Sequence, residues 1–242
     1  MRYFIELSYK GTVYHGWQIQ PDANSVQEEI NKAISTILQE EINVVGAGRT
    51  DAGVHATQMF AHFDAQKELN EAHVYKFNSV LPNDIVIHSL SEVSDDAHAR
   101  FDASSRSYEY HIWLGRNAFS LETSWQLYQQ QELDVVTMNK AANALLEYTD
   151  FECFSKVKTD VKTFNCTVTH AEWKQEGQKL IFCISANRFL RNMVRAIVGT
   201  LLEVGQGKKS VEDFRKVIES KKRSEAGLSV PAQGLFLTEV KY

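Results

Sequence analysis

Residues 46–53 read Gly46-Ala47-Gly48-Arg49-Thr50-Asp51-Ala52-Gly53, and they separate two segments with strand patterning. So many glycines do not suit the interior of a helix or strand, so this stretch is predicted to be a loop. It is a poor match to a dinucleotide or Walker loop, because Asp51 replaces the last fingerprint glycine and no Lys-Ser/Thr pair follows. From the loop alone, Asp51 is either a turn residue bonded to a nearby backbone N–H or a reactive carboxylate.

The two histidines that follow do not favour a metal site. His55 and His62 could join Asp51 as two imidazoles and a carboxylate. Side chains alternate along a strand, however, so residues seven apart lie on opposite faces. Both histidines are therefore predicted to be structural.

Hydrophobic patterning outward from the loop predicts a mixture of helices and strands. Apolar residues alternate over Arg2–Tyr9, and they recur every three to four residues after Ser25, a predicted N-cap in a capping box with Glu28. The remaining predicted strands are 42–45, 54–64, 85–90, 105–114, 161–173, 179–185 and 235–240, and the remaining predicted helices are 70–80, 134–146, 189–204 and 210–220. The pattern predicts an α+β protein with two similar lobes, 1–103 and 104–242, joined near Phe101–Ser105.

Composition indicates an ordinary globular protein. The chain has 242 residues, of which 43% are hydrophobic and 24% charged. Its three cysteines, Cys153, Cys166 and Cys183, are too few and too scattered for a disulfide framework or a thiolate zinc site. No run approaches the ~20 apolar residues that span a bilayer, and Glu6 interrupts any signal-peptide core. We therefore expect a cytoplasmic protein without a membrane anchor.

Charge is distributed unevenly along the chain. The net charge is −5, yet residues 186–223 hold ten basic residues against four acidic ones. A local basic surface can bind phosphates on an acidic protein. The alternative is a solvated helix face without a ligand.

Several segments in order resemble one known family, the TruA-type tRNA pseudouridine synthases. The loop continues as Gly48–Ala56 (Gly-Arg-Thr-Asp-Ala-Gly-Val-His-Ala), which resembles the signature of that family. The other matching segments are Tyr9–Gln20, Ser25–Gln27, Asn78 with Leu81–Ile85, His98–Phe101, Arg106 with Tyr108 and Tyr110, Asp150 with Phe151 and Phe154, Phe189–Arg195, and Pro231–Leu235. The chain departs from the family pattern at Gln58-Met59-Phe60, at Ala97, and at Arg191-Asn192.

The resemblance implies an isomerase. Family members convert uridine to pseudouridine at positions 38, 39 and 40 of the anticodon stem and loop of tRNA, without a metal or an organic cofactor. The implied fold has two lobes whose largely antiparallel sheets join into one extended sheet, with the active-site cleft between them. The implied assembly is a homodimer that holds the anticodon arm of tRNA.

The resemblance also assigns the site residues. Asp51 is the implied nucleophile, and Arg195 is the basic partner that keeps it ionised. Tyr108 lies against the target base, although a core tyrosine would fit its strand pattern equally well. Arg49 is expected to support the flipped-out base or its phosphates, the alternative being a salt bridge between the lobes.

Three further expectations concern the basic stretch and the function. On the predicted helix 189–204, Arg188 and Arg191 share a face with Arg195 and would bind substrate, and Lys208, Lys209 and Lys221–Arg223 would extend the phosphate track. One alternative function is a catalytically inactive tRNA-binding module of the same fold, which would have no need of Asp51, Tyr108 and Arg195 together. Another is a carboxylate-dependent nucleosidase for small molecules, which would leave the basic stretch unused.

Overall fold

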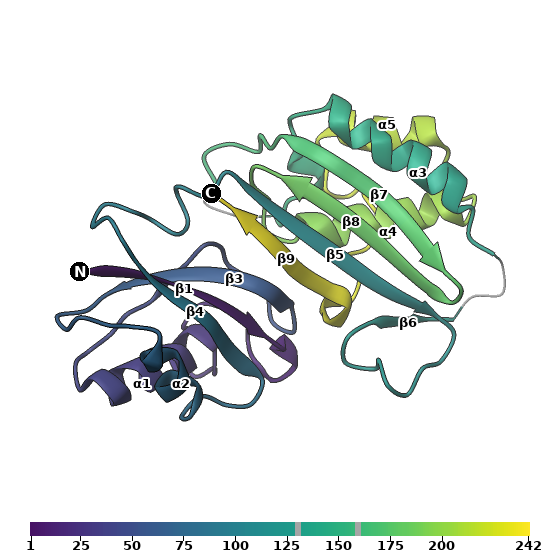
Figure 1. The fold of residues 1–242 in the computed structure, drawn as a ribbon. Helices are drawn as coiled ribbons and strands as arrows, with labels where there is room; N and C mark the ends of the chain where they lie inside the picture. The colour runs from purple at the N-terminus through teal and green to yellow at the C-terminus, as the bar shows by residue number, and fades with distance from the viewer. Residues whose placement is uncertain (129–131, 158–160) are drawn as a thin grey trace. The chain divides into compact units, whose positions relative to one another are not determined.

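The computed structural model describes residues 1–128, 132–157 and 161–242, and the chain divides into two compact units (Figure 1). Unit 1 comprises Met1–Ser104 together with Phe236–Tyr242, and unit 2 comprises Ser105–Leu235. From Phe236 onward the last strand belongs to unit 1, where it pairs with β3 (His55–Asp64). A linear reading of the chain could not anticipate this return.

Unit 1 is a sheet with two helices. Its strands follow the order β4-β1-β3-β9, with the short β2 paired to β3. The elements are β1 (Arg2–Tyr9), α1 (Val26–Leu38), β2 (Val45–Gly46), β3 (His55–Asp64), α2 (Ala72–Asn78), β4 (Ile85–Val93) and β9 (Leu235–Lys241), with a 3₁₀ turn at Gly11–Val13. β1 is antiparallel to both β3 and β4, whereas β9 runs parallel to β3.

Local sequence explains why the first elements form. Alternate residues of β1 are buried, as the period of two predicts. Ser25 caps α1 by accepting a hydrogen bond from the Glu28 N–H at 3.3 Å. The predicted capping box is only half formed, because the Glu28 carboxylate instead pairs with Lys32 one turn later, at 2.8 Å.

The atypical Gln58 has a structural role. The parallel pairing of β3 with β9 covers only His55 with Phe236 and Ala56 with Leu237. Beyond it, Gln58 accepts a hydrogen bond from the Val240 N–H at 2.9 Å and donates one to Glu6 at 2.8 Å. The side-chain amide thus ties β9 to unit 1 after the main-chain ladder ends.

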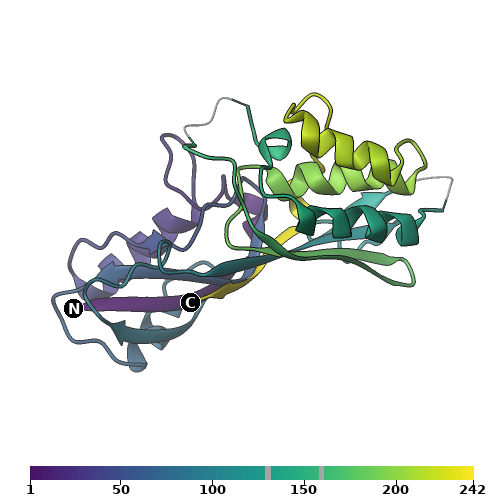
Figure 2. The same cartoon turned by 90° about the horizontal axis from the view of Figure 1, so that it is seen from above.

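The strands belong to a single nine-stranded sheet, and unit 2 places three helices on one face of its own part, whose strand order is β6-β5-β8-β7 (Figures 1 and 2). The elements are β5 (Ser105–Leu114), β6 (Trp125–Leu127), α3 (Val135–Ala144), β7 (Val168–Glu176), β8 (Lys179–Ala186), α4 (Met193–Gly205) and α5 (Val211–Ser220), with 3₁₀ turns at Leu145–Glu147, Glu152–Phe154 and Ala232–Gly234. Asp134 caps α3, and Ser210 with Asp213 forms a complete capping box at the start of α5.

The central helix α4 differs from its prediction. Every residue of α4 is buried except Arg195 and Glu203, so the helix has no broad polar face. It also begins at Met193 rather than Phe189, because Asn192 has a φ of 69° and breaks the helical path just before it. The predicted strand 161–173 likewise begins only at Val168, because Phe164–Cys166 pairs with Thr149–Phe151 instead of continuing along β8.

Two other sequence predictions concern cysteines and membranes. Cys153 and Cys166 are buried thiols and Cys183 is half-buried, and all three are free, as predicted. No helix within the described ranges is long and apolar enough to cross a membrane.

Candidate active site

The loop that carries Asp51 is fixed by the segment that follows β1. The Trp17 N–H donates to the Thr50 carbonyl at 3.3 Å, and the Gly53 N–H donates to the Tyr14 carbonyl at 3.2 Å. The Thr50 hydroxyl shares a 2.8 Å hydrogen bond with the hydroxyl of Tyr9. Main-chain and side-chain bonds on both sides of Asp51 therefore hold its backbone in place.

Gly16 is required for this close contact. Its φ of 92° lies in the left-handed region that favours glycine. A Cβ atom at this position would also lie 2.3 Å from the Thr50 carbonyl oxygen. The chain therefore uses glycine where segment 9–17 passes directly against the Asp51 loop.

Tyr14 anchors the same segment to β4. Its hydroxyl donates to Asp84 Oδ1 at 2.7 Å, and the Lys10 N–H donates to the Asp84 carbonyl. Burial and the hydrogen bond to Asp84 raise the pKa of Tyr14, so its phenol remains a donor at neutral pH. Asp84 belongs to the Leu81–Ile85 motif, which explains why that distant segment accompanies the Asp51 loop.

Asp51 is half-buried at the turn of the loop. Its main-chain carbonyl accepts the Val54 N–H at 3.2 Å, so the main chain closes this turn. Gly53, with a φ of 79°, lets the chain reverse immediately after it. This geometry presents a carboxylate on a restrained backbone, which suits a nucleophile or base better than a mobile surface acid.

Arg49 lies two residues before Asp51 and is exposed. Its guanidinium makes no ion pair with the described residues of unit 1. An exposed guanidinium on the Asp51 loop leaves its charge available to a ligand.

His55 and His62 act as hydrogen-bond acceptors in the core of unit 1, as predicted for structural histidines. His55 Nδ1 accepts the Gly11 N–H at 2.9 Å, and His62 Nδ1 accepts the Ala99 N–H at 3.1 Å. Burial, reinforced by the charges of His98 and Arg2, lowers the pKa of His62 to about 4, which keeps its ring neutral. No cluster of three or more metal-ligating side chains occurs among the residues that the structure covers.

Tyr108 and Tyr110 lie two positions apart on β5 but differ in environment. Tyr110 is buried and donates its hydroxyl to the Pro231 carbonyl at 2.7 Å. Tyr108 is half-buried, and its ring meets that of Phe189 edge-on, with centroids 5.0 Å apart. Tyr110 is thus the core tyrosine, while Tyr108 is only partly covered and packs edge-on against Phe189.

Arg195 is held from the first turn of α4. Its Nε donates to the Val230 carbonyl at 2.7 Å, and the Val230 N–H donates to the Arg195 carbonyl at 3.2 Å. This reciprocal pair fixes the direction of the guanidinium relative to the helix. Arg195 and Glu203 are also the two residues of α4 that reach the surface.

A network behind Arg195 holds the segment that contains Val230. Ser229 Oγ accepts hydrogen bonds from Asn192 Nδ2 at 2.6 Å and from Arg223 Nη2 at 2.9 Å. Arg223 also donates to the Gly227 carbonyl at 3.0 Å, and the Gly227 N–H donates to Thr200 on α4 at 2.9 Å. The sequence did not predict this network. Its one signal was that Asn192 departs from the family pattern.

Arg188 and Arg191 do not share a helix face with Arg195. Both precede α4, in the non-helical segment after β8, because the positive φ of Asn192 separates them from the helix. Arg188 is half-buried and Arg191 is exposed. The predicted single stripe of three arginines is therefore wrong, although all three residues belong to unit 2.

Two residues of the predicted phosphate track have partners within the protein. Lys221 pairs with Asp150 at 2.7 Å, and the Arg223 guanidinium is occupied by Ser229 and main-chain carbonyls. Arg215 similarly pairs with Glu147 at 2.5 Å. The acidic partners come from outside the basic stretch, so a charge count along that stretch could not reveal these pairs.

The predicted site residues thus form two sets. Unit 1 carries Arg49 and Asp51 on one restrained loop, and unit 2 carries Tyr108, Arg188, Arg191 and Arg195. Together they offer a carboxylate, an aromatic hydroxyl and several guanidinium groups. Such groups can add to or deprotonate a substrate, stack on a base and bind phosphates.

Comparison with known proteins points to one family. A family profile described as tRNA pseudouridine synthase matches residues 7–102 and 141–242. A protein of Bacteroides thetaiotaomicron named tRNA pseudouridine synthase A is 54% identical, over 100% of this chain and 90% of its own. Proteins of the same name from Bacteroides fragilis and Bacillus licheniformis are 52% and 40% identical over 100% of this chain, and 96% and 99% of their own lengths are covered.

Proposed function

This chain belongs to the tRNA pseudouridine synthase family, and on that premise we propose that it isomerises uridine to pseudouridine in tRNA. The observation that carries the proposal is the family signature folded as a restrained loop around Asp51. Segment 9–17, which belongs to another family motif, supplies the hydrogen bonds that restrain it. Two motifs that are separate in sequence therefore meet at the loop that carries Asp51.

The reaction is an isomerisation whose atoms balance without a co-substrate. The bond between N1 of the base and C1′ of the ribose breaks, and a bond from C5 to C1′ forms. The proton on C5 leaves to solvent, and N1 gains a proton. The net change is neither an oxidation nor a hydrolysis, so acid–base and nucleophilic groups can carry it.

Asp51 is the proposed nucleophile. A carboxylate can attack C6 of the base, attack C1′ of the ribose, or remove the 2′ proton, and each of these roles requires the ionised form. We propose that Arg195 supports that ionised form by its positive charge. The hydrogen bond from Nε to the Val230 carbonyl holds the guanidinium in one place, so its positive charge would always act from the same position.

Tyr108 and the arginines are proposed to hold the extruded base and its backbone. A base inside a stacked stem is inaccessible, so it must be flipped out at a cost of a few kcal/mol. The Tyr108 ring can contact the flipped base, and its hydroxyl can handle the C5 proton. Arg49, Arg188 and Arg191 can bind phosphates or stack on neighbouring bases.

The proposed targets are positions 38, 39 and 40 of the anticodon arm, and the proposed assembly is a cytoplasmic homodimer. The target positions and the homodimer follow from the family resemblance. Light scattering on the purified protein tests the assembly, with a dimer expected at twice the 27.6 kDa chain mass. A species at the chain mass at micromolar concentration would contradict it.

Tritium release tests the activity and its substrate together. The protein is incubated with tRNA carrying [5-³H]uridine, with the same tRNA whose positions 38–40 are cytidine, and with free [5-³H]uridine. Release from the first substrate alone supports the proposal. Equal release from the cytidine-substituted tRNA would contradict the proposed positions, and release from free uridine would favour a small-molecule enzyme.

A further inference from the structure

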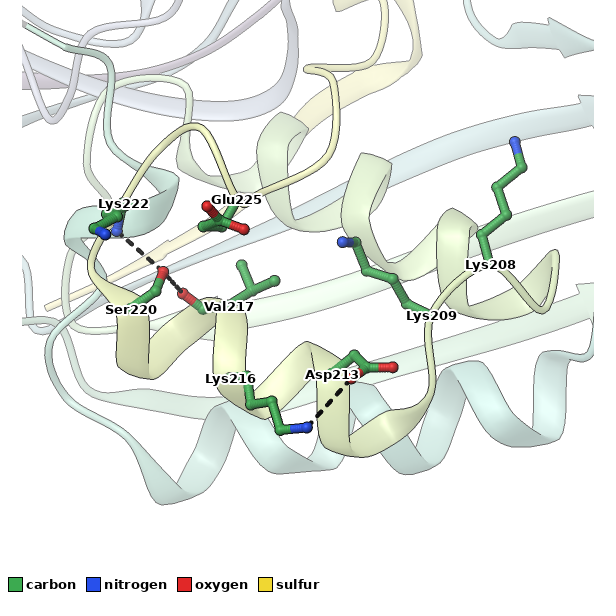
Figure 3. Close-up of a pocket in the computed structure, with 8 residues that line it drawn as sticks. All are labelled: Lys208, Lys209, Asp213, Lys216, Val217, Ser220, Lys222 and Glu225. Atoms are coloured by element: carbon green, nitrogen blue, oxygen red, sulfur yellow. Dashed lines mark hydrogen bonds and ion pairs between the residues drawn. The ribbon is translucent and has the colours of Figure 1, made fainter.

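A cavity of about 380 Å³ lies in unit 2 beside the α4–α5 connection and the end of α5 (Figure 3). Its lining is dominated by lysines and contains one aliphatic residue, Val217. The full lining is Lys208, Lys209, Asp213, Lys216, Val217, Ser220, Lys222 and Glu225. The volume falls in the range of ligand pockets, ~300–1,000 Å³, but those pockets are mostly apolar, so the chemistry here favours an anion.

The charges of this lysine groove are incompletely compensated inside the protein. Lys209 lies 3.7 Å from Glu203, and Lys216 lies 3.5 Å from Asp213. Within the described part of the chain, the ammonium groups of Lys208 and Lys222 make no ion pair, and both side chains are exposed. Four cations against two carboxylates in the lining leave the groove positive.

The structure also separates these lysines from their basic neighbours. Lys221 and Arg223 lie on either side of Lys222 in the sequence, but Lys221 pairs with Asp150 and Arg223 donates a hydrogen bond to Ser229. Of these three residues, Lys222 is the one in the lining of the groove, and Figure 3 shows it at the same end of the groove as Glu225. The groove is therefore a smaller and differently composed surface than the basic stretch suggested.

We propose that the lysine groove binds backbone phosphates of the tRNA substrate, apart from the residues that act on the target base. The proposal rests on the proposed function, because it takes its ligand from that function. Lysines act as flexible point charges toward phosphate, and the two longer ion pairs can exchange an acidic partner for a phosphate. The expected contribution is to tRNA affinity and not to the chemical step.

The test compares two charge-neutralising double variants of the full-length protein. Lys208→Gln/Lys222→Gln removes two groove charges. Lys140→Gln/Lys174→Gln removes two exposed charges from α3 and β7 in the same unit. Each protein is titrated with tRNA by anisotropy over 50–300 mM KCl, and tritium release is measured at saturating tRNA.

The groove variant is expected to bind tRNA about tenfold or more weakly at 100 mM KCl. Its slope of log affinity against log salt should be shallower by roughly 1.4–1.8, since each lost phosphate contact removes ~0.7–0.9. Its kcat should stay at the wild-type value. Lys208→Arg/Lys222→Arg should restore the affinity, because it restores the charge.

Two outcomes would overturn the proposal. One is a groove variant whose salt slope matches the wild type or the Lys140/Lys174 control. The other is that millimolar inorganic tripolyphosphate stabilises the protein against unfolding only when Lys208 and Lys222 are intact, while the groove variant keeps the wild-type affinity for tRNA. That result would assign the groove to a small polyphosphate. Failure of the proposed function is distinguishable, since the wild type would then bind tRNA without releasing tritium.

Discussion

At the residue scale, catalysis is proposed to depend on one carboxylate whose backbone is held by a neighbouring motif. Asp51 lies between Thr50, bonded to Tyr9 and Trp17, and Gly53, bonded to Tyr14. Bonds on both sides restrict how far the carboxylate can move. The same reasoning applies to Arg195, which Val230 restrains through two hydrogen bonds.

Tyr9→Phe tests the restraint on the Asp51 loop. The change removes one hydroxyl and leaves the Thr50 hydroxyl without that partner, so we expect a loss of about 1 kcal/mol in unfolding free energy. Turnover should fall by about 10-fold to 100-fold, because small displacements of a reacting group are costly. Urea denaturation and tritium release measure the two effects. Tyr75→Phe, at an exposed position on α2, is the control and should change neither.

Ser229→Ala tests the network behind Arg195. The variant removes the shared acceptor of Asn192 and Arg223, which loosens the segment that carries Val230. We expect kcat to fall by about tenfold with KM within twofold, because the chemical step and not tRNA binding depends on the position of Arg195. Ser224→Ala, at an exposed position nearby, should keep the wild-type kcat. A pure rise in KM for Ser229→Ala would contradict the positioning role.

The buried His62 predicts a pH dependence of stability. Its folded-state pKa of about 4 lies below the ordinary value of 6.5, so the unfolded chain takes up the proton first. The unfolding free energy should therefore decline as pH falls from about 6.5 toward 4. His62→Gln should flatten this decline, since the amide can accept the Ala99 N–H without titrating. Urea titrations at several pH values measure it, and an unchanged slope in the variant would contradict the assignment of this decline to His62.

At the element scale, the sequence predicted most helices and strands because their periodicity is strong. The bounds of β1 and β5 agree with the alternation, and the cap at Ser25 begins its helix as predicted. The start of α4 was missed because a left-handed Asn192 leaves no signal in hydrophobic spacing. The start of β7 was missed because a competing pairing of 164–166 is nonlocal.

Gly16→Ala tests the close contact between segment 9–17 and the Asp51 loop. A methyl group there meets the Thr50 carbonyl in addition to the cost of a positive φ. Gly207→Ala has a φ of 70° but open space around the added Cβ, so it isolates the backbone cost of about 1 kcal/mol. Gly16→Ala should lose at least twice as much unfolding free energy and should lose turnover, whereas Gly207→Ala should keep turnover. Equal losses in the two variants would show that the contact with Thr50 is unimportant.

At the scale of the whole molecule, the sequence supplied the family and the candidate residues but not their supports. Asp51, Tyr108 and Arg195 could be named from motifs that span the chain, and the profile match over 7–102 and 141–242 agrees with that family. Ser229 accepts a hydrogen bond from the distant Asn192 side chain, and Asp84 accepts hydrogen bonds from the distant Tyr14 and Lys10; no local pattern encodes these contacts. The return of β9 to unit 1 and the pairing of Lys221 with Asp150 were hidden for the same reason.

The most direct test of the central claim is tritium release by Asp51→Ala compared with the wild type, on [5-³H]uridine-labelled tRNA that both proteins bind. Tight binding of tRNA by both, with release by the wild type alone, is the predicted result. Release by Asp51→Ala at a rate near that of the wild type would contradict the assignment of the nucleophile to Asp51.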